Sequence, residues 1–129
     1  MSEFEPMKPE IRDLWVNALL SGEYRRNRHR LKDPDGSYCP LGVLCELYRQ
    51  QTGVGEWGER PSLKNGLAFI VPPGHHQFVW PHHLVLSWAG ISDALLDRNG
   101  DTIKGIISGK NDSNKLDFDG MGEWIKNNL

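Results

Sequence analysis

The sequence has few cysteines, little net charge and no long apolar run, and each shortage narrows the class of protein. Two cysteines among 129 residues agree with a reducing compartment, and a chain of this length buries a core without disulfides. A formal net charge of −2 argues against a protein that coats nucleic acid through its overall charge. The apolar runs are too short to span a bilayer, and the acidic start at Glu3 and Glu5 is unlike a secretory leader. We therefore expect a cytoplasmic protein without a membrane-bound role.

The hydrophobic pattern predicts one α+β domain over residues 1–129, mainly helical with a small antiparallel β-hairpin or sheet. Apolar residues recur at helical spacing between Pro9 and Gly22, two residue types that begin and end helices. A second helix over 40–51 carries a wider apolar face and ends at Gly53. We expect this second helix to be the central and most buried one.

The middle of the chain predicts a hairpin followed by a helix. Residues that favour strands occupy 67–71 and 77–80, and a Pro-Pro-Gly turn at 72–74 separates them. Pro81 then opens a helix that ends at Gly90.

Turn residues organise the remaining segments. The connection over 53–66 is rich in Gly, Glu, Arg and Pro, so we expect it to be exposed. The segment 102–109 fits a helix or a strand, and its pattern does not separate the two. Residues 111–113 predict a turn and cap before a last helix that begins near Asp117 or Asp119.

A cationic segment that leads into a helix start carries the main functional clue. Because the first backbone N–H groups of a helix are unpaired and its dipole is positive there, cations held beside it make an anion site. Arginine binds phosphates bidentately and stacks on bases, which favours a nucleotide when aromatic rings lie nearby. The same run is also typical of a solvated surface. The expected ligand-binding residues are Arg25, Arg26, Arg28, Arg30, Tyr24, Tyr38, Leu41 and Gly42.

The two cysteines offer a competing, catalytic interpretation. Cys39 precedes Pro40 and Cys45 lies in the same predicted helix, about 9 Å further along its axis, which is too far for a disulfide. A thiol at a helix start beside arginines has a lowered pKa. A nucleophile also needs a base and an oxyanion site, and the sequence supplies no assignable candidate. We therefore predict no catalytic residue and a protein that is not an enzyme, with Cys45 in the core.

Histidines near the predicted hairpin raise the question of a metal. The four are His75, His76, His82 and His83. A hairpin followed by a helix start brings such residues near one another, as zinc or nickel sites require. No carboxylate or cysteine stands at a ligand spacing, however, and neighbouring residues of a strand point to opposite faces. We predict no metal site and no cofactor.

Several segments together carry a resemblance to a known family. They are 14–19, 21–24, 39–48 with the motif Cys-Pro-Leu-Gly-Val-Leu-Cys, 86–91 with Trp-Ala-Gly-Ile, and 111–113 followed by Phe118. In this order they resemble a family of small, mostly uncharacterised proteins encoded by tailed phages and prophages. Pro40 stands where that family often has a second cysteine, and 64–81 is more elaborate than usual.

The resemblance implies a binding function in evasion of host defence, either by sequestering a nucleotide signal or by blocking a defence protein. We expect the first, with an anionic nucleotide-type ligand held by the arginines. The alternative is a protein-binding inhibitor that uses the hairpin and the connection 53–66, and a hydrolase built on Cys39 or on a metal comes third. Nucleic acid is a less favoured partner, because sustained binding needs a longer cationic track. Proteins that sequester signals often bind them between subunits, which is compatible with a homo-oligomer.

Overall fold

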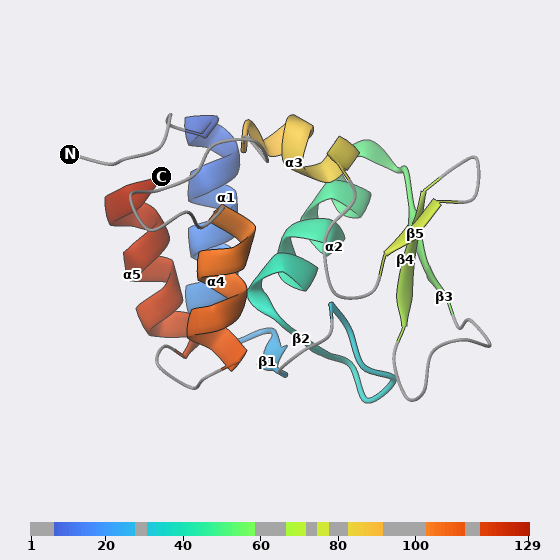
Figure 1. The fold of residues 1–129 in the computed structure, drawn as a ribbon, viewed down its shortest axis with the longest axis horizontal. Coiled ribbons are helices and arrows are strands. Elements are labelled where there is room, and N and C mark those ends of the chain that lie inside the picture. Colours follow the sequence, from blue (N-terminus) through green and yellow to red (C-terminus); the bar gives the residue numbers. More distant parts are fainter. Residues whose placement is uncertain are drawn as a thin grey trace.

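A computed structural model of the chain describes residues 7–27, 31–58, 67–71, 75–77, 83–91, 103–112 and 117–129. Helices dominate it, and the strands are short, so the expected α+β class is confirmed (Figure 1). The elements are α1 (Pro9–Leu20), β1 (Arg25–Arg26), β2 (Ser37–Tyr38), α2 (Pro40–Thr52), β3 (Glu56–Gly58), β4 (Ala68–Val71), β5 (His75–Gln77), α3 (His83–Ala89), α4 (Ile103–Asp112) and α5 (Phe118–Asn128). Among the described residues, no helix has the length and apolar character needed to cross a membrane.

Helix α2 lies between the three helices α1, α4 and α5 and the three-stranded sheet, with α3 above it in the view of Figure 1. Cys39 caps its start, and Gly53 ends it in a left-handed conformation with φ of 73°, which glycine adopts without strain. Every residue from Pro40 to Tyr48 is buried, so the prediction of a central helix is confirmed. Helix α1 packs on α5 and α2, and Trp15 Nε1 donates a hydrogen bond of 2.9 Å to the carbonyl of Pro40.

The predicted hairpin is present and gains a third strand. β4 pairs antiparallel with β5, and β3 pairs antiparallel with the other edge of β4. The connection that the sequence presents as exposed therefore contains a strand, whose Trp57 lies opposite Phe69. Residues 78–80 and Pro81, which the sequence assigns to the hairpin and the next helix, lie outside the described residues.

A second, smaller sheet joins the basic segment to the rest of the fold. β1 and β2 pair in parallel, with Arg25 opposite Ser37 and Arg26 opposite Tyr38. Lys32 bridges Tyr38 on one side and Leu67 on the other, and its carbonyl accepts a hydrogen bond of 2.9 Å from the Leu67 amide. Lys32 therefore links the two-stranded sheet to the start of β4.

For the segment 102–109 the sequence fits a helix or a strand, and the structure has a helix over its described part, because α4 begins at Ile103 and continues to Asp112. The turn expected at 111–113 is therefore wrong for Asn111 and Asp112, which both lie in the last turn of α4, and Ser113 lies outside the described residues. Asn111 is 1% exposed. Its Nδ2 donates 2.8 Å to the carbonyl of Asn27, so the side chain ties α4 to the end of β1. Asp117 caps α5 as expected, accepting 2.8 Å from the Gly120 amide.

Candidate ligand-binding site

Pairing across the two sheets places cations and an aromatic ring in one row. Arg26 lies opposite Tyr38, Tyr38 lies opposite Lys32, and Lys32 lies opposite Leu67. Residues that lie directly opposite one another on neighbouring strands project to the same face. Arg26, Tyr38 and Lys32 therefore share a face, although they come from three different segments.

Aromatic rings extend this face on both sides. The Tyr24 and Tyr38 rings meet edge to face with centroids 5.3 Å apart, and Trp57 approaches Tyr38 at 5.9 Å. The Lys32 ammonium lies 4.9 Å from the Tyr38 centroid and 5.4 Å from that of Trp57, within reach of cation–π attraction. We call Tyr24, Arg26, Lys32, Tyr38 and Trp57 the cation–aromatic face.

A buried carboxylate on α2 holds the edge of this face in place. Glu46 accepts hydrogen bonds from Trp57 Nε1 at 2.8 Å, from Gln50 Nε2 at 2.9 Å and from Arg49 through both Nε and Nη2. Burial alone raises the pKa of Glu46, but the hydrogen bonds from Arg49, Gln50 and Trp57 outweigh it, so the pKa is lowered. The carboxylate is thus ionised and committed to its donors, and it fixes the Trp57 ring.

A hollow of about 230 Å³ opens beside Arg26. Its lining comes from β1 with the residue before it and from the start of α5: Tyr24, Arg26, Asp117, Phe118 and Asp119. Burial raises the pKa of Tyr24, which also hydrogen-bonds Gln50, so its phenol stays neutral. The hollow is therefore lined by a guanidinium, a phenol and two carboxylates.

Arg25 lies apart from Arg26, the other described arginine of the expected site. Because successive residues of a strand point to opposite faces, Arg25 and Arg26 cannot converge on one group from β1. The Arg25 guanidinium instead donates to the carbonyl of Asp35. The Asp35 carboxylate accepts from the Ser37 hydroxyl at 2.6 Å and the Ser37 amide at 2.9 Å, and these bonds lower its pKa. Arg25 therefore braces the turn before β2.

The helix start expected to face an anion is closed. Leu41 is 1% exposed and Gly42 is buried. A Cβ on Gly42 would lie 1.8 Å from the carbonyl oxygen of Leu31, so the chain just before Lys32 crosses the helix start in direct contact. The Gly42 amide donates 3.3 Å to Cys39 Sγ. This part of the expected site is corrected: Leu41 and Gly42 belong to the core.

Arg28 and Arg30 lie outside the described residues. So do the side chains of the four histidines considered for a metal, and the described residues contain no group of three or more His, Cys, Asp or Glu placed to hold one. Neither cysteine forms a disulfide, and both are buried. Burial raises the pKa of Cys45 well above its ordinary value, which suits the core role predicted for it.

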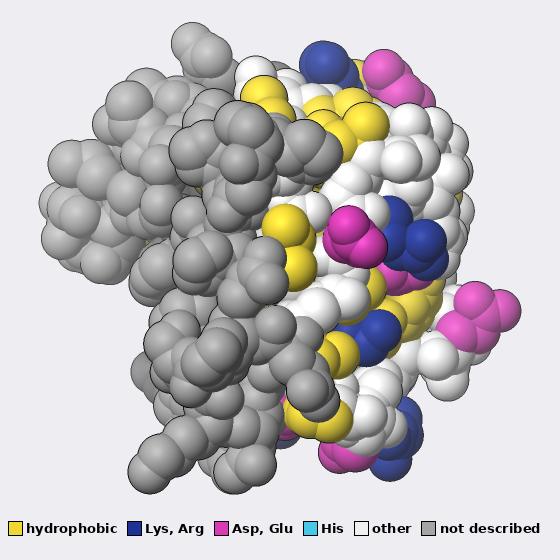
Figure 2. Space-filling view, turned by 90° about the vertical axis from the view of Figure 1, so that its right-hand side faces the viewer, with side chains coloured by type: hydrophobic (Ala, Val, Ile, Leu, Met, Phe, Trp, Pro, Cys, Tyr) yellow, Lys and Arg dark blue, Asp and Glu magenta, His cyan; other side chains and the backbone are white. Residues whose placement is uncertain are grey.

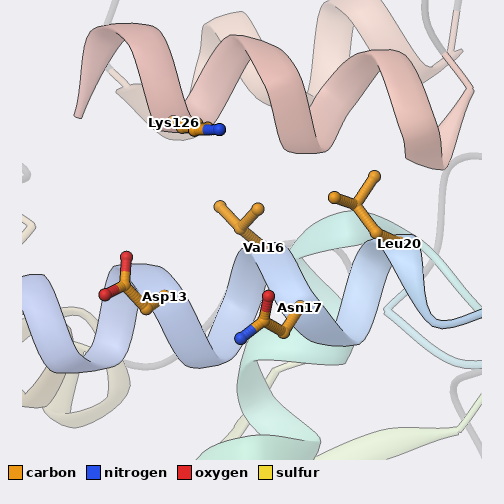
Figure 3. A pocket seen from close by; sticks show the side chains of 5 residues that line it. All are labelled: Asp13, Val16, Asn17, Leu20 and Lys126. Atoms are coloured by element: carbon orange, nitrogen blue, oxygen red, sulfur yellow. The ribbon is translucent and has the colours of Figure 1, made fainter.

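A larger hollow of about 330 Å³ lies elsewhere, between α1 and α5. Figure 3 shows Asp13, Val16, Asn17 and Leu20 on α1, with Lys126 on the facing helix. Asp13 is already 3.4 Å from the Arg12 guanidinium, and no residue of the expected site lines this hollow. The two hollows share no lining residue, and the expected site residues Tyr24 and Arg26 belong to the smaller one.

Several residues of the site have no clear signal in the sequence. Lys32 is visible only as one more cation in the basic segment, and its place between two rings depends on long-range pairing. Glu46 is the more detectable one, because a carboxylate between Cys45 and Leu47 interrupts the apolar pattern of a central helix and must find donors when buried. On the face drawn in Figure 2, cationic, acidic and apolar side chains of the described residues are interspersed, so any attraction for an anion is local.

These features define a small α+β domain in which cations and aromatic rings share one face. The chain belongs to the family described as a domain of unknown function (DUF8296), whose profile matches residues 7–129. Comparisons with curated proteins and with solved structures gave no match.

Proposed function

We propose that the protein is a binding protein that captures an anionic, nucleotide-type ligand, and that it serves a phage by withdrawing such a signal from host defence. The observation that carries the ligand class is the row of Arg26, Tyr38 and Lys32, which places two cations on either side of the Tyr38 ring. Tyr38 was expected to contact the ligand, but it is 8% exposed and belongs to the core, so its ring supports the two cations from below. The phage context comes from the resemblance of the sequence segments described above.

The chemistry of the row suits phosphate joined to a ring. A guanidinium binds phosphate oxygens through two parallel hydrogen bonds, and an ammonium adds a point charge. Tyr24 and Trp57 are half-buried, so each keeps part of its surface exposed next to those cations. Glu46 holds Trp57 in place, which lowers the ordering cost of binding.

A second candidate is a protein-binding inhibitor, and one observation favours it. Within the three-stranded sheet, β3 lies at an edge, and Val54 just before it is an exposed large apolar side chain. An edge strand can pair with an extended segment of a partner through backbone hydrogen bonds. Such a partner would leave the cation–aromatic face unused.

The test removes the two cations of the row together. An Arg26→Ala/Lys32→Ala variant is compared with Arg12→Ala/Lys126→Ala, which removes the same two residue types from α1 and α5. Binding is measured by calorimetry against the four ribonucleoside triphosphates and a set of cyclic dinucleotides. Hydrogen bonds to charged groups contribute about 1.5–3 kcal/mol each, so we expect the first variant to lose at least roughly tenfold in affinity. The control variant should bind like the wild type.

The salt response identifies the class of ligand. A small ligand should lose affinity only modestly between low and physiological salt, whereas a nucleic acid with many phosphate contacts should weaken by orders of magnitude. Wild-type protein that binds none of the nucleotides, or equal affinity in both double variants, would contradict the proposed function. A stable complex with a host protein that survives the Arg26→Ala/Lys32→Ala change would favour the inhibitor.

A further inference from the structure

An arginine that does not belong to the basic segment lies beside the cation–aromatic face. Arg49, in the last turn of α2, donates through Nε to Glu46 Oε1 at 2.9 Å, and the Trp57 indole donates to the same oxygen at 2.8 Å. The guanidinium and the edge of the indole are therefore neighbours around one carboxylate oxygen. The Lys32 ammonium lies over the same indole, 5.4 Å from its centroid. Arg49 and Lys32 thus both lie beside Trp57.

The pair with Glu46 uses only one side of the Arg49 guanidinium. The donors to Glu46 are Nε and Nη2, and no other acceptor contacts Arg49 among the residues that the structure describes. A guanidinium is a planar fork with further N–H groups on Nη1 and on the outer side of Nη2, and these point away from Glu46. Because 41% of the side chain is exposed, a ligand can approach this outer edge.

Glu46 fixes the direction in which the outer edge points. Its side chain is 8% exposed, and its negative charge is shared among the donors from Arg49, Gln50 and Trp57. Two parallel hydrogen bonds hold a planar guanidinium in one orientation. A ligand therefore does not have to order this long side chain when it binds.

The Tyr24 phenol adds a donor near the same edge. Burial raises the pKa of Tyr24, and its hydrogen bond with Gln50 opposes that effect, which means that Gln50 donates to the phenol oxygen. The phenol keeps its own proton to donate. The hydrogen bond with Glu46 raises the pKa of Arg49, and Tyr38 and Tyr24 lie close enough to raise it further. A guanidinium fork and a neutral phenol are therefore close together.

We propose that Arg49 is a phosphate-binding residue of this site, which holds two oxygens of one phosphate group with the outer edge of its guanidinium while the Tyr24 hydroxyl donates to the same group. The proposal rests on the proposed function and adds to it a residue from α2. A phosphate group presents pairs of terminal oxygens that match the spacing of such a fork. An ammonium at this position would supply charge without the two parallel bonds.

The test separates the fork from the charge. Arg49→Lys keeps a positive charge beside Glu46 and lacks the fork. Arg12→Lys is the control, because Arg12 lies on α1 and is likewise paired with a carboxylate, that of Asp13 at 3.4 Å. Calorimetry measures binding of the nucleotide bound best among ATP, GTP, CTP, UTP, cyclic di-AMP and cyclic di-GMP. A second measurement uses the unaltered protein: phenylglyoxal modifies guanidinium groups, and mass spectrometry follows its reaction with Arg49 and Arg12 with and without that nucleotide.

We expect Arg49→Lys to weaken binding at least roughly tenfold, because a charged pair of hydrogen bonds is reduced to one, and Arg12→Lys to bind like the wild type. Bound nucleotide should slow the modification of Arg49 severalfold and leave that of Arg12 unchanged. Arg49→Lys that binds as tightly as the wild type overturns the inference and leaves the proposed function standing. Equal modification of Arg49 with and without the nucleotide does the same, even where Arg49→Lys binds weakly. Wild-type protein that binds none of the nucleotides overturns the inference and the proposed function together.

Discussion

The contact between Gly42 and Leu31 gives a prediction whose sign depends on the tertiary structure. Both Gly42, in α2, and Gly109, in α4, lie in helices, where alanine is favoured over glycine by about 1 kcal/mol. A Cβ at Gly109 meets no atom within 4 Å. A Cβ at Gly42 would lie 1.8 Å from the Leu31 carbonyl oxygen and 2.6 Å from its carbon. The same substitution should therefore stabilise one helix and damage the other.

The magnitude at Gly42 follows from what obstructs the added methyl group. The obstacle is backbone, which cannot rotate away as a side chain can, and the Leu31 carbonyl also accepts 3.3 Å from the Cys39 amide. Overpacking typically costs about 1–3 kcal/mol and occasionally more, and this geometry belongs at the upper end of that range. After the gain in helix propensity, Gly42→Ala should lower the free energy of unfolding by about 2 kcal/mol or more.

Thermal unfolding followed by circular dichroism measures both changes. For a chain of this size, 1 kcal/mol corresponds to about 4 °C in Tm. Gly42→Ala should then unfold roughly 8 °C below the wild type, and Gly109→Ala up to about 4 °C above it. Equal or higher stability of Gly42→Ala would refute the close approach of Leu31 to α2. It would also reopen the helix start as part of an anion site.

Three further predictions concern polar groups of the fold. Glu46→Gln should lower the free energy of unfolding by about 1–3 kcal/mol at neutral pH. Because folding lowers the pKa of Glu46, this difference from the wild type should be fully present above the ordinary pKa of 4.5 and should shrink as the pH falls through the lowered pKa. Urea unfolding at several pH values measures it. Cys39→Ser keeps a capping acceptor and should retain ligand binding within a few fold. Cys39→Ala removes this acceptor and should lower the free energy of unfolding by about 1 kcal/mol, measured by urea unfolding. Lost binding in a folded Cys39→Ser would revive the catalytic hypothesis. Asn111→Ala removes the Nδ2 donor to the Asn27 carbonyl, so urea unfolding should show a loss of about 1–3 kcal/mol in the free energy of unfolding, and an unchanged midpoint would contradict the bridge.

Helix boundaries were the most predictable part of the fold, because they depend on local chemistry. Pro9 and Pro40 start helices and Gly53 ends one in the left-handed conformation, each for a reason that the residue type carries by itself. The two strands β1 and β2 have two residues each, too few to show an alternating pattern. Their pairing, and with it the face to which each arginine points, could not be derived from the sequence.

In the candidate site too, local features could be predicted from the sequence and long-range contacts could not. Tyr24 and Tyr38 were expected to flank the basic segment, and their rings are in contact. The separation of Arg25 from Arg26 follows from strand alternation, which applies only once β1 is known to exist. The burial of Gly42 depends on Leu31, eleven positions earlier in the chain, and no local pattern indicates that such a segment returns to cover the helix start.

The residues on either side of 28–30 are both held by the neighbouring strand β2 and by helices. The Asn27 amide donates 2.8 Å to the Tyr38 carbonyl, and the Leu31 carbonyl accepts from the Cys39 amide. Both flanking residues are therefore fixed to neighbouring positions at the end of β2. Asn111 holds Asn27 from α4, and Gly42 closes on Leu31 from α2. Contacts from two separate helices therefore fix these flanking residues. The residue types at Gly42 and Asn111 are explained by the position of the basic segment rather than by the helices that contain them.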